Sequence, residues 1–219
     1  MLKTDWNDFH ALNRSAARKS AALDNAGKAA ARLVRIVTTS PFMAAALVLI
    51  LHHNIPGALH SPLHVALSIL GLSVLPLIGY PLSRVLPPFK GKGRQGERSL
   101  TIILSVAGYA LCAVMAFGFN DAPIEKCVIV TYLISGALIA LSSFLLHFRA
   151  SGHACGVCGP IAALTLLVSP WYLLGGVLVW AVCRASLSLK RHTLPELVAG
   201  AAYSVVSLLI AATALGIWP

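Results

Sequence analysis

Seven apolar stretches alternate with short polar loops along this chain. They lie at residues 37–53, 62–85, 99–119, 126–148, 153–169, 171–187 and 196–218. Most approach the ~20 residues that a helix needs to cross a bilayer, and the fifth and sixth are nearer the minimum of ~17. These two share the turn Ser169-Pro170, so we expect them to be tilted or partly unwound. The pattern predicts an all-α, polytopic transmembrane helix bundle with six to seven spans.

The composition agrees with a membrane protein. Of the 219 residues, 58% are hydrophobic and only 11% are charged, whereas a soluble domain has about a quarter of its residues charged. An ordinary secretory signal peptide is not expected, because the first apolar run follows about 35 polar or basic residues. Residues 1–36 form a basic N-terminal segment, either an amphipathic helix on the inner membrane surface or a flexible tail. Residues 37–219 form one transmembrane domain.

The predicted topology places almost all of the positively charged residues on one side of the membrane. The formal net charge is +10, and sixteen of the seventeen Lys and Arg residues lie on the N-terminal side, Lys126 being the exception. Basic residues collect in cytoplasmic loops, so this distribution needs no nucleic-acid partner. It predicts an integral protein of the inner or cell membrane, with the N-terminus in the cytoplasm.

Three polar islands on that same side carry most of the reactive residues. They span residues 87–99, 149–153 and 183–200, and two crossings separate each island from the next. They supply Lys90, Lys92, Arg94 and Arg98, then Ser151, Gly152 and His153, then Arg184, Lys190, Arg191, His192 and Glu196. The topology therefore predicts one composite site at the cytoplasmic membrane interface.

The residue types in these islands suit a phosphate group. Guanidinium and ammonium groups bind phosphate oxygens, and the N-terminus of the fifth segment presents free backbone N–H groups beside Ser151 and Gly152. Two histidines, His153 and His192, provide what phosphoryl transfer needs. One can attack phosphorus and the other can protonate the departing oxygen.

The motifs resemble those of the type 2 phosphatidic acid phosphatase superfamily of membrane lipid phosphatases. The similarity covers residues 86–200 and rests on "SGHA" at 151–154, the preceding Lys/Arg loop and "RHTLPELVAG" at 191–200. That family has a lysine followed after six residues by Arg-Pro, then Pro-Ser-Gly-His. Its third motif is Ser-Arg, five residues, His, three residues and Asp. The resemblance implies a metal-independent lipid phosphatase without a cofactor.

It also implies a role for each site residue. His192 is expected to be the nucleophile that forms a phosphohistidine, Glu196 to orient it and His153 to be the general acid. The residues expected to bind phosphate oxygens are Lys90, Lys92, Arg98, Ser151 and Gly152, with Arg184 and Arg191 as candidate replacements for a missing arginine.

The chain departs from the family pattern at several positions. Ala150 replaces the proline of the second motif, and Ser99 replaces that of the first, where Lys92 and Lys90 precede Arg98 by six and eight residues. Ser186 stands six residues before His192, at the position of the third motif's arginine.

Several residues have simpler structural interpretations. Thr193 and Glu196 fit a helix-capping box, a role compatible with orienting His192. Cys155, Cys158 and His153 are too few for a typical zinc site, so we expect no metal and small thiols packed between helices. The four histidines at 52, 53, 60 and 64 are expected at the opposite membrane interface.

Three lipid classes present a phosphate on an apolar tail: isoprenyl diphosphate, phosphatidate and phosphatidylglycerophosphate. Two other functions remain open for the same site. One is lipid binding or transport without hydrolysis, which the serine at position 186 favours, and the other is transfer of the phosphoryl group to a lipid or sugar.

Overall fold

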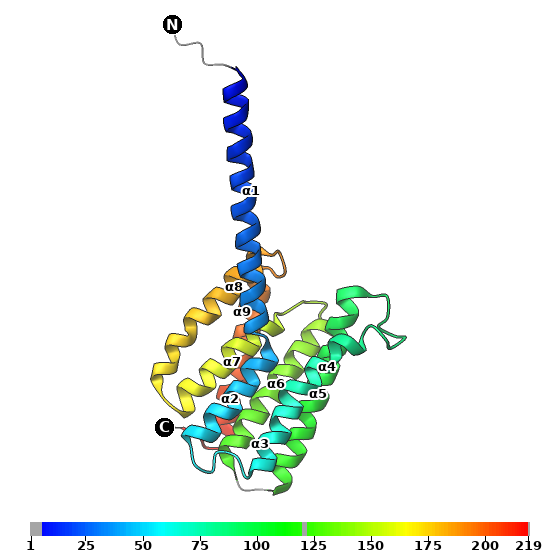
Figure 1. Cartoon of the computed structure of the whole chain (residues 1–219). Coiled ribbons are helices and arrows are strands. Elements are labelled where there is room, and N and C mark those ends of the chain that lie inside the picture. The colour runs from blue at the N-terminus through cyan, green and yellow to red at the C-terminus, as the bar shows by residue number, and fades with distance from the viewer. Residues whose placement is uncertain (1–5, 120–121, 219) are drawn as a thin grey trace.

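The structure, a computed structural model, describes residues 6–119 and 122–218, with side chains from residue 19 onward except that of residue 119. These residues form helices and turns without a β-strand. Five helical segments are long and apolar enough to cross a membrane, and a bent helix pair adds a sixth. The predicted all-α bundle is confirmed (Figure 1).

The first two helices meet at a bend that becomes important for the site. Helix α1 (Trp6–Val37) and helix α2 (Ser40–Asn54) are inclined at 46°. Pro41, in the first turn of α2, has no N–H to continue the hydrogen bonds of α1. We call residues 35–40 the elbow.

Helix α1 extends well beyond the bundle, and only its last turns pack against it, on helix α8 (Gly176–Ser188) (Figure 1). Residues 6–37 are thus one continuous helix. The location of this helix on a membrane surface stays a prediction, and residues 1–5 lie outside the described residues.

The second apolar stretch is a broken helix. It consists of α3 (Pro62–Ile69), a π-helical turn η1 (Leu70–Val74) and α4 (Leu75–Leu82). The π turn ends two residues before Pro76, whose ring would clash in a regular α-helix with the carbonyl group four residues earlier, inside the π turn. Wider winding at this point relieves that conflict without ending the span.

Helices α6 (Pro123–Phe144), α7 (Gly152–Leu167) and α9 (Leu194–Ala214) form the centre of the bundle. Helix α7 packs against α9 and α2, α6 packs against α9, and α5 (Gly93–Phe119) covers α6. Helix α7 has 16 residues, so it spans about 24 Å, less than the ~30 Å hydrocarbon core. The 3₁₀ turn η2 (Pro170–Gly175) then leads into α8, so the fifth and sixth segments are short, as predicted.

A buried polar contact joins α3 and α6 at the end of the bundle away from α1. Nδ1 of His64 lies 2.8 Å from Oε1 of Glu125, and the backbone N–H of His60 donates to the other carboxylate oxygen at 3.0 Å. Both His64 and Glu125 are at most 5% exposed. This contact gives part of the histidine cluster a structural role.

Candidate functional site

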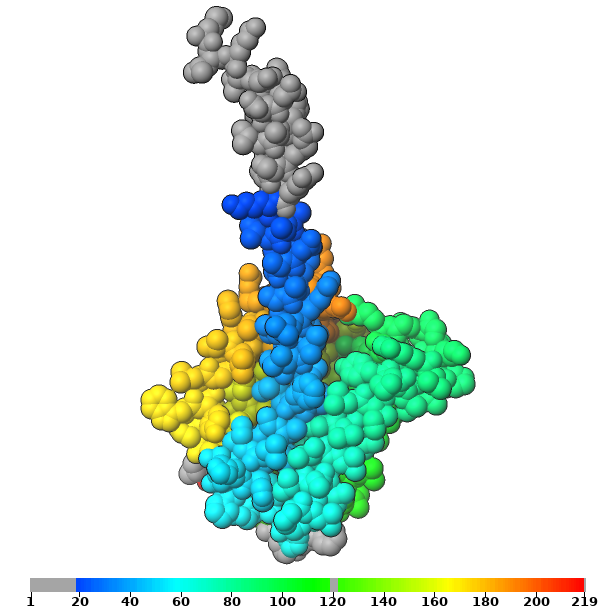
Figure 2. Space-filling view, in the orientation of Figure 1, coloured from blue at the N-terminus to red at the C-terminus, as the bar shows by residue number. Residues whose placement is uncertain are grey.

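A cavity of about 360 Å³ opens at the end of the bundle where α1 begins to project. The elbow, the first turns of α5 and α7 and the α8–α9 loop surround its mouth. Figure 2 shows the surface hollowed between the base of α1 and the segment that leads into α5. Its lining includes His153, His192 and five arginines: Arg35, Arg94, Arg98, Arg149 and Arg191. Glu97 is the one carboxylate among the described lining residues. The cavity is therefore suited to an anion.

His192 lies in the loop between α8 and α9, with its ring held by the first turn of α9. Its Nδ1 is 2.8 Å from Oε2 of Glu196, and the same oxygen accepts the Thr193 backbone N–H at 3.1 Å. Glu196 thus caps the helix and orients the histidine at once. Since a carboxylate only accepts hydrogen bonds, Nδ1 carries the proton and Nε2 of the neutral ring keeps its lone pair.

The surroundings of His192 favour its neutral form. Burial lowers the pKa of His192 below its usual value, and the positive charges of Arg98 and Arg35 lower it further. The hydrogen bond and negative charge of Glu196 raise this pKa without cancelling the decrease. At neutral pH the imidazole is therefore a free base, which is the form that can act as a nucleophile.

His153 is held at the start of α7 by a contact with the elbow. Its Nε2 lies 3.1 Å from Oγ1 of Thr38, and that hydroxyl donates its own proton to the Val34 carbonyl oxygen at 2.7 Å. The threonine oxygen therefore accepts from Nε2–H of the histidine. This leaves Nδ1 as the ring nitrogen that can exchange a proton with a ligand.

The residues just before His153 shape the backbone of the site. Ser151 is fully buried, and its hydroxyl accepts the Ala154 N–H at 3.2 Å as the N-cap of α7. Its backbone N–H donates to the Glu196 carbonyl oxygen at 2.8 Å. Gly152 lines the cavity. Of this predicted phosphate-binding pair, Gly152 faces the cavity, while the serine side chain is occupied in holding the helix start.

Arg98 also connects two of the islands. Its guanidinium donates to Oγ of Ser143 at 2.9 Å and to the Ala150 carbonyl oxygen at 3.1 Å. These bonds fix the arginine beside the start of α7 while it lines the cavity. The structure thus brings Arg98, Gly152, His153, Arg191 and His192 together, as predicted.

Three predicted phosphate-binding residues lie elsewhere. Lys90, Lys92 and Arg184 are exposed and do not line the cavity. The two lysines are in a glycine-rich turn where Gly91 and Gly93 have positive φ angles. Arg184 lies on an outward face of α8, next to the buried Ala185 and Ser186 on the inward face.

The cavity also contains arginines to which the sequence analysis assigned no individual role in phosphate binding. These are Arg35 of α1, Arg94 of α5 and Arg149 of the loop before α7. Arg35 has a recognisable sequence signal, because it interrupts the apolar run "LVRIV" at residues 33–37. An ionisable residue in such a run is a candidate functional residue.

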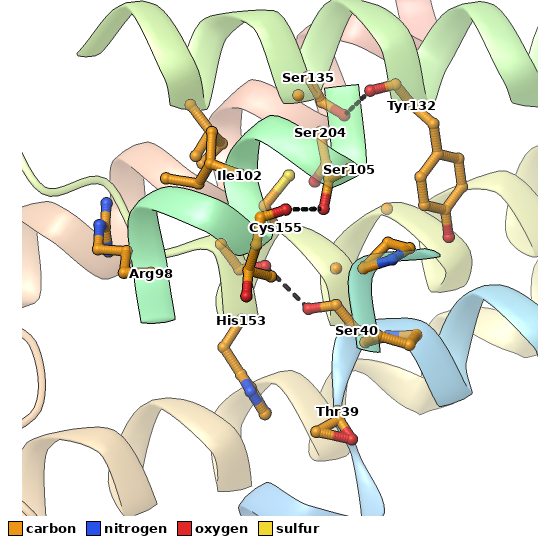
Figure 3. A pocket seen from close by; sticks show the side chains of 18 of the residues that line it. Thr39, Ser40, Arg98, Ile102, Ser105, Tyr132, Ser135, His153, Cys155 and Ser204 are labelled. Carbon is orange, nitrogen blue, oxygen red and sulfur yellow. Dashed lines mark hydrogen bonds between the residues drawn. The ribbon is translucent and has the colours of Figure 1, made fainter. Parts of the chain in front are cut away.

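The deeper wall of the cavity combines apolar side chains with hydroxyl groups. Figure 3 shows Ser105, Ser135 and Ser204 around Cys155. Among the described residues, the buried hydroxyls of Thr101 and Tyr132 have no hydrogen-bond partner. Both residues line the cavity, so a ligand with polar groups close to its anionic end fits this wall.

Comparison with models of known families, with curated proteins and with solved structures gives no match to this chain. Within the part of the chain that the structure describes, no cluster of three or more His, Cys, Asp or Glu residues is placed to hold a metal ion. The candidate function therefore follows from the geometry of the two histidines and the arginines around them.

Proposed function

We propose that this protein is an integral membrane phosphatase that hydrolyses a lipid phosphate or diphosphate through a phosphohistidine. The observation that carries the proposal is that His153 and His192 line one arginine-rich cavity, with His192 oriented by Glu196. A nucleophile, a group that orients it and a second proton-transferring residue form a recurrent catalytic arrangement. The motif resemblance to the membrane lipid phosphatases agrees with this arrangement.

The first chemical step forms a bond between Nε2 of His192 and phosphorus. The bond between phosphorus and the leaving oxygen breaks, and that oxygen takes a proton from Nδ1 of His153, which enters the step as the imidazolium because the negative charge of the bound phosphate favours its protonated form. Glu196 stabilises the positive charge that develops on the attacking ring through its hydrogen bond to Nδ1. The arginines around the cavity stabilise the charge on the phosphoryl oxygens.

The second step returns the enzyme to its starting state. His153, now neutral, takes a proton from a water molecule as that water attacks phosphorus. The bond between phosphorus and Nε2 breaks, inorganic phosphate leaves, and the lone pair returns to His192. Each histidine thus ends the cycle in its initial protonation state, and no cofactor enters the reaction.

The size of the cavity limits which part of the substrate it encloses. A volume of about 360 Å³ is at the lower end for ligand pockets. It suits a phosphate headgroup and the adjoining part of the molecule, while a long tail remains among the helices or in the lipid. Isoprenyl diphosphate, phosphatidate and phosphatidylglycerophosphate are the classes to test.

The decisive experiment measures phosphate release from these lipids by purified protein and by His192→Ala and His153→Ala. We expect loss of turnover by several orders of magnitude for His192→Ala, and by ~10²–10⁴-fold for His153→Ala. His147→Ala is a matched control, because His147 is exposed and lies outside the cavity. Unaltered turnover in either test variant removes that histidine from the mechanism.

The same assay separates hydrolysis from the two other functions. If folded wild-type protein binds these lipids and releases no phosphate, it is a lipid-binding or transport protein. If phosphate release is slow until a second alcohol is added, and the phosphorylated alcohol then accumulates, the protein is a phosphotransferase.

We further propose that the site faces the cytoplasm, because the excess of Lys and Arg lies on the same side of the predicted membrane as the site. A single cysteine introduced near Gly93, in a cysteine-free background, tests this orientation. We expect a membrane-impermeant thiol reagent to label it only after the cells are opened. Labelling of intact cells contradicts the orientation.

A further inference from the structure

The elbow between α1 and α2 contacts the site at three points. Thr38 accepts the hydrogen bond from His153, and Ser40 donates its hydroxyl proton to the Gly152 carbonyl oxygen at 3.0 Å. Arg35 donates from its guanidinium to the hydroxyl of Ser186 on α8. The elbow is therefore built into the wall of the cavity, although it is more than 110 residues from these partners along the chain.

Arg35 lies where its guanidinium can bind an anion in the cavity. It lines the cavity together with both histidines and is partly buried. Among the described residues, no carboxylate forms a salt bridge with it. Its positive charge also contributes to lowering the pKa of His192, which lines the same cavity. A partly buried cation without a charged partner has an energetic reason to bind an anion.

Ser186 explains how the guanidinium is held there. This serine is fully buried, and its own proton goes to the Val182 carbonyl oxygen at 2.7 Å. Its oxygen therefore accepts from Arg35 and leaves the other N–H groups of the guanidinium for a ligand. Ser186 is also the position at which the resembled family's third motif has its arginine.

We propose that Arg35 binds a phosphoryl oxygen and replaces, from the N-terminal helix, the arginine that is absent at position 186. Helix α1 thereby completes the phosphate site, and Ser186 is a positioning residue for Arg35. The inference rests on the proposed function for its substrate, but the anion-binding role of Arg35 can be measured without catalysis.

The first test compares Arg35→Ala with Arg32→Ala. Arg32 is one turn earlier on α1, exposed and outside the cavity, so its variant removes the same charge from the same helix. We expect Arg35→Ala to lower kcat/KM on the order of 100-fold, Arg35→Lys to retain part of this activity, and Arg32→Ala to behave as wild type. Equal activity of folded Arg35→Ala and Arg32→Ala overturns the inference.

The second test moves the arginine to the other side of the same contact. The double variant Arg35→Ala with Ser186→Arg is expected to recover much of the activity lost in Arg35→Ala, whereas Ser186→Ala should chiefly raise KM. If the folded double variant is no more active than Arg35→Ala, the two positions are not equivalent and that part of the inference is wrong.

A binding assay distinguishes failure of this inference from failure of the proposed function. Inorganic phosphate should raise the thermal unfolding midpoint of wild-type protein and Arg32→Ala by mass action. Arg35→Ala should need much more phosphate for the same increase. If wild type binds phosphate in this way but hydrolyses no lipid, the phosphatase proposal fails and the role of Arg35 stands. If Arg35→Ala is protected as well as Arg32→Ala, the role of Arg35 fails.

Discussion

The close contact between Gly200 of α9 and Ser151 at the start of α7 gives a demanding test of the site geometry. A Cβ atom at position 200 would lie 2.2 Å from the Ser151 carbonyl oxygen, 3.0 Å from its carbonyl carbon and 3.1 Å from its nitrogen. All three are backbone atoms, so no side chain can rotate to make room. Ordinary contact needs roughly 3.4 Å, and Gly200→Ala must therefore separate the two segments by about 1.2 Å.

That separation has a calculable cost. The hydrogen bond from Ser151 N–H to the Glu196 carbonyl oxygen, now 2.8 Å, would lengthen to about 4 Å, beyond the range of a hydrogen bond. Its loss costs about 1 kcal/mol, and the overpacking adds about 1–3 kcal/mol. We expect Gly200→Ala to lower the free energy of unfolding by about 2–4 kcal/mol, which corresponds to roughly 5–15 °C in Tm.

The same displacement should reduce activity in the molecules that remain folded. His153 follows Ser151 by two residues, and Glu196 is one turn before Gly200, so the substitution moves the two halves of the site apart. A misplacement of about 1 Å costs on the order of 100-fold in rate. Thermal unfolding in detergent and phosphate release, measured below Tm, report the two effects separately.

Gly176→Ala is the matched control, because a Cβ at that position of α8 meets nothing within 4 Å. It should unfold at or slightly above the wild-type temperature and keep full activity. A Gly200→Ala variant that matches Gly176→Ala in Tm would refute the close approach of α9 and the start of α7. A variant that loses stability but keeps its full rate would refute the claim that this contact sets the spacing of the proposed catalytic groups.

Three further predictions concern other parts of the molecule. Because His192 has a lowered pKa, the loss of kcat/KM through protonation of this proposed nucleophile should occur at a pH below the usual histidine pKa of ~6.5. Glu196→Gln removes the negative charge that raises the pKa of His192 but keeps an oxygen that can accept the Nδ1–H, so the acid limb should move to still lower pH; a shift to higher pH contradicts the assignment. Lys90→Ala and Lys92→Ala should leave KM unchanged in the same assay, since neither residue lines the cavity, and a large rise in KM would place the lysine at the substrate. Glu125→Ala should lower the free energy of unfolding by about 2–4 kcal/mol, because it removes two buried hydrogen bonds. The rate per folded molecule should not change. Denaturation and turnover measurements on the same variant check both expectations.

The features that the sequence predicts best are local or periodic. Apolar runs define the helices, and the even number of crossings between polar islands predicts their common face. His192 lies just before the N-cap Thr193 and Glu196 lies in the first turn of α9, so the short separation between them allows the capping role and the histidine contact to coexist. These features are determined by neighbouring residues or by the regular alternation of apolar runs and loops, so they can be predicted from a sequence pattern.

The features that the sequence did not predict depend on tertiary packing. Arg35 is one of seven basic residues in the N-terminal segment, and only the bend at the elbow and the contact with α8 direct it to Ser186. Lys90 and Lys92 have nearly the expected motif spacing, but positive φ angles at Gly91 and Gly93 give their turn a path that leaves both exposed. Motif spacing specifies distance along the chain, whereas the direction of a turn depends on its backbone angles.

Close packing of small residues is what makes this site possible between membrane helices. In a bilayer the hydrophobic effect does not hold helices together, and close contact between small residues has to contribute instead. Gly200 meets Ser151, and Gly156 of α7 meets Ser40 of the elbow so closely that a Cβ would lie 2.1 Å from the serine oxygen. These contacts adjoin His153 and the loop that carries His192, so the packing that stabilises the bundle also sets the shape of the cavity. Substitutions at the two glycines should therefore reduce stability and activity together, whereas Arg35→Lys should reduce activity alone.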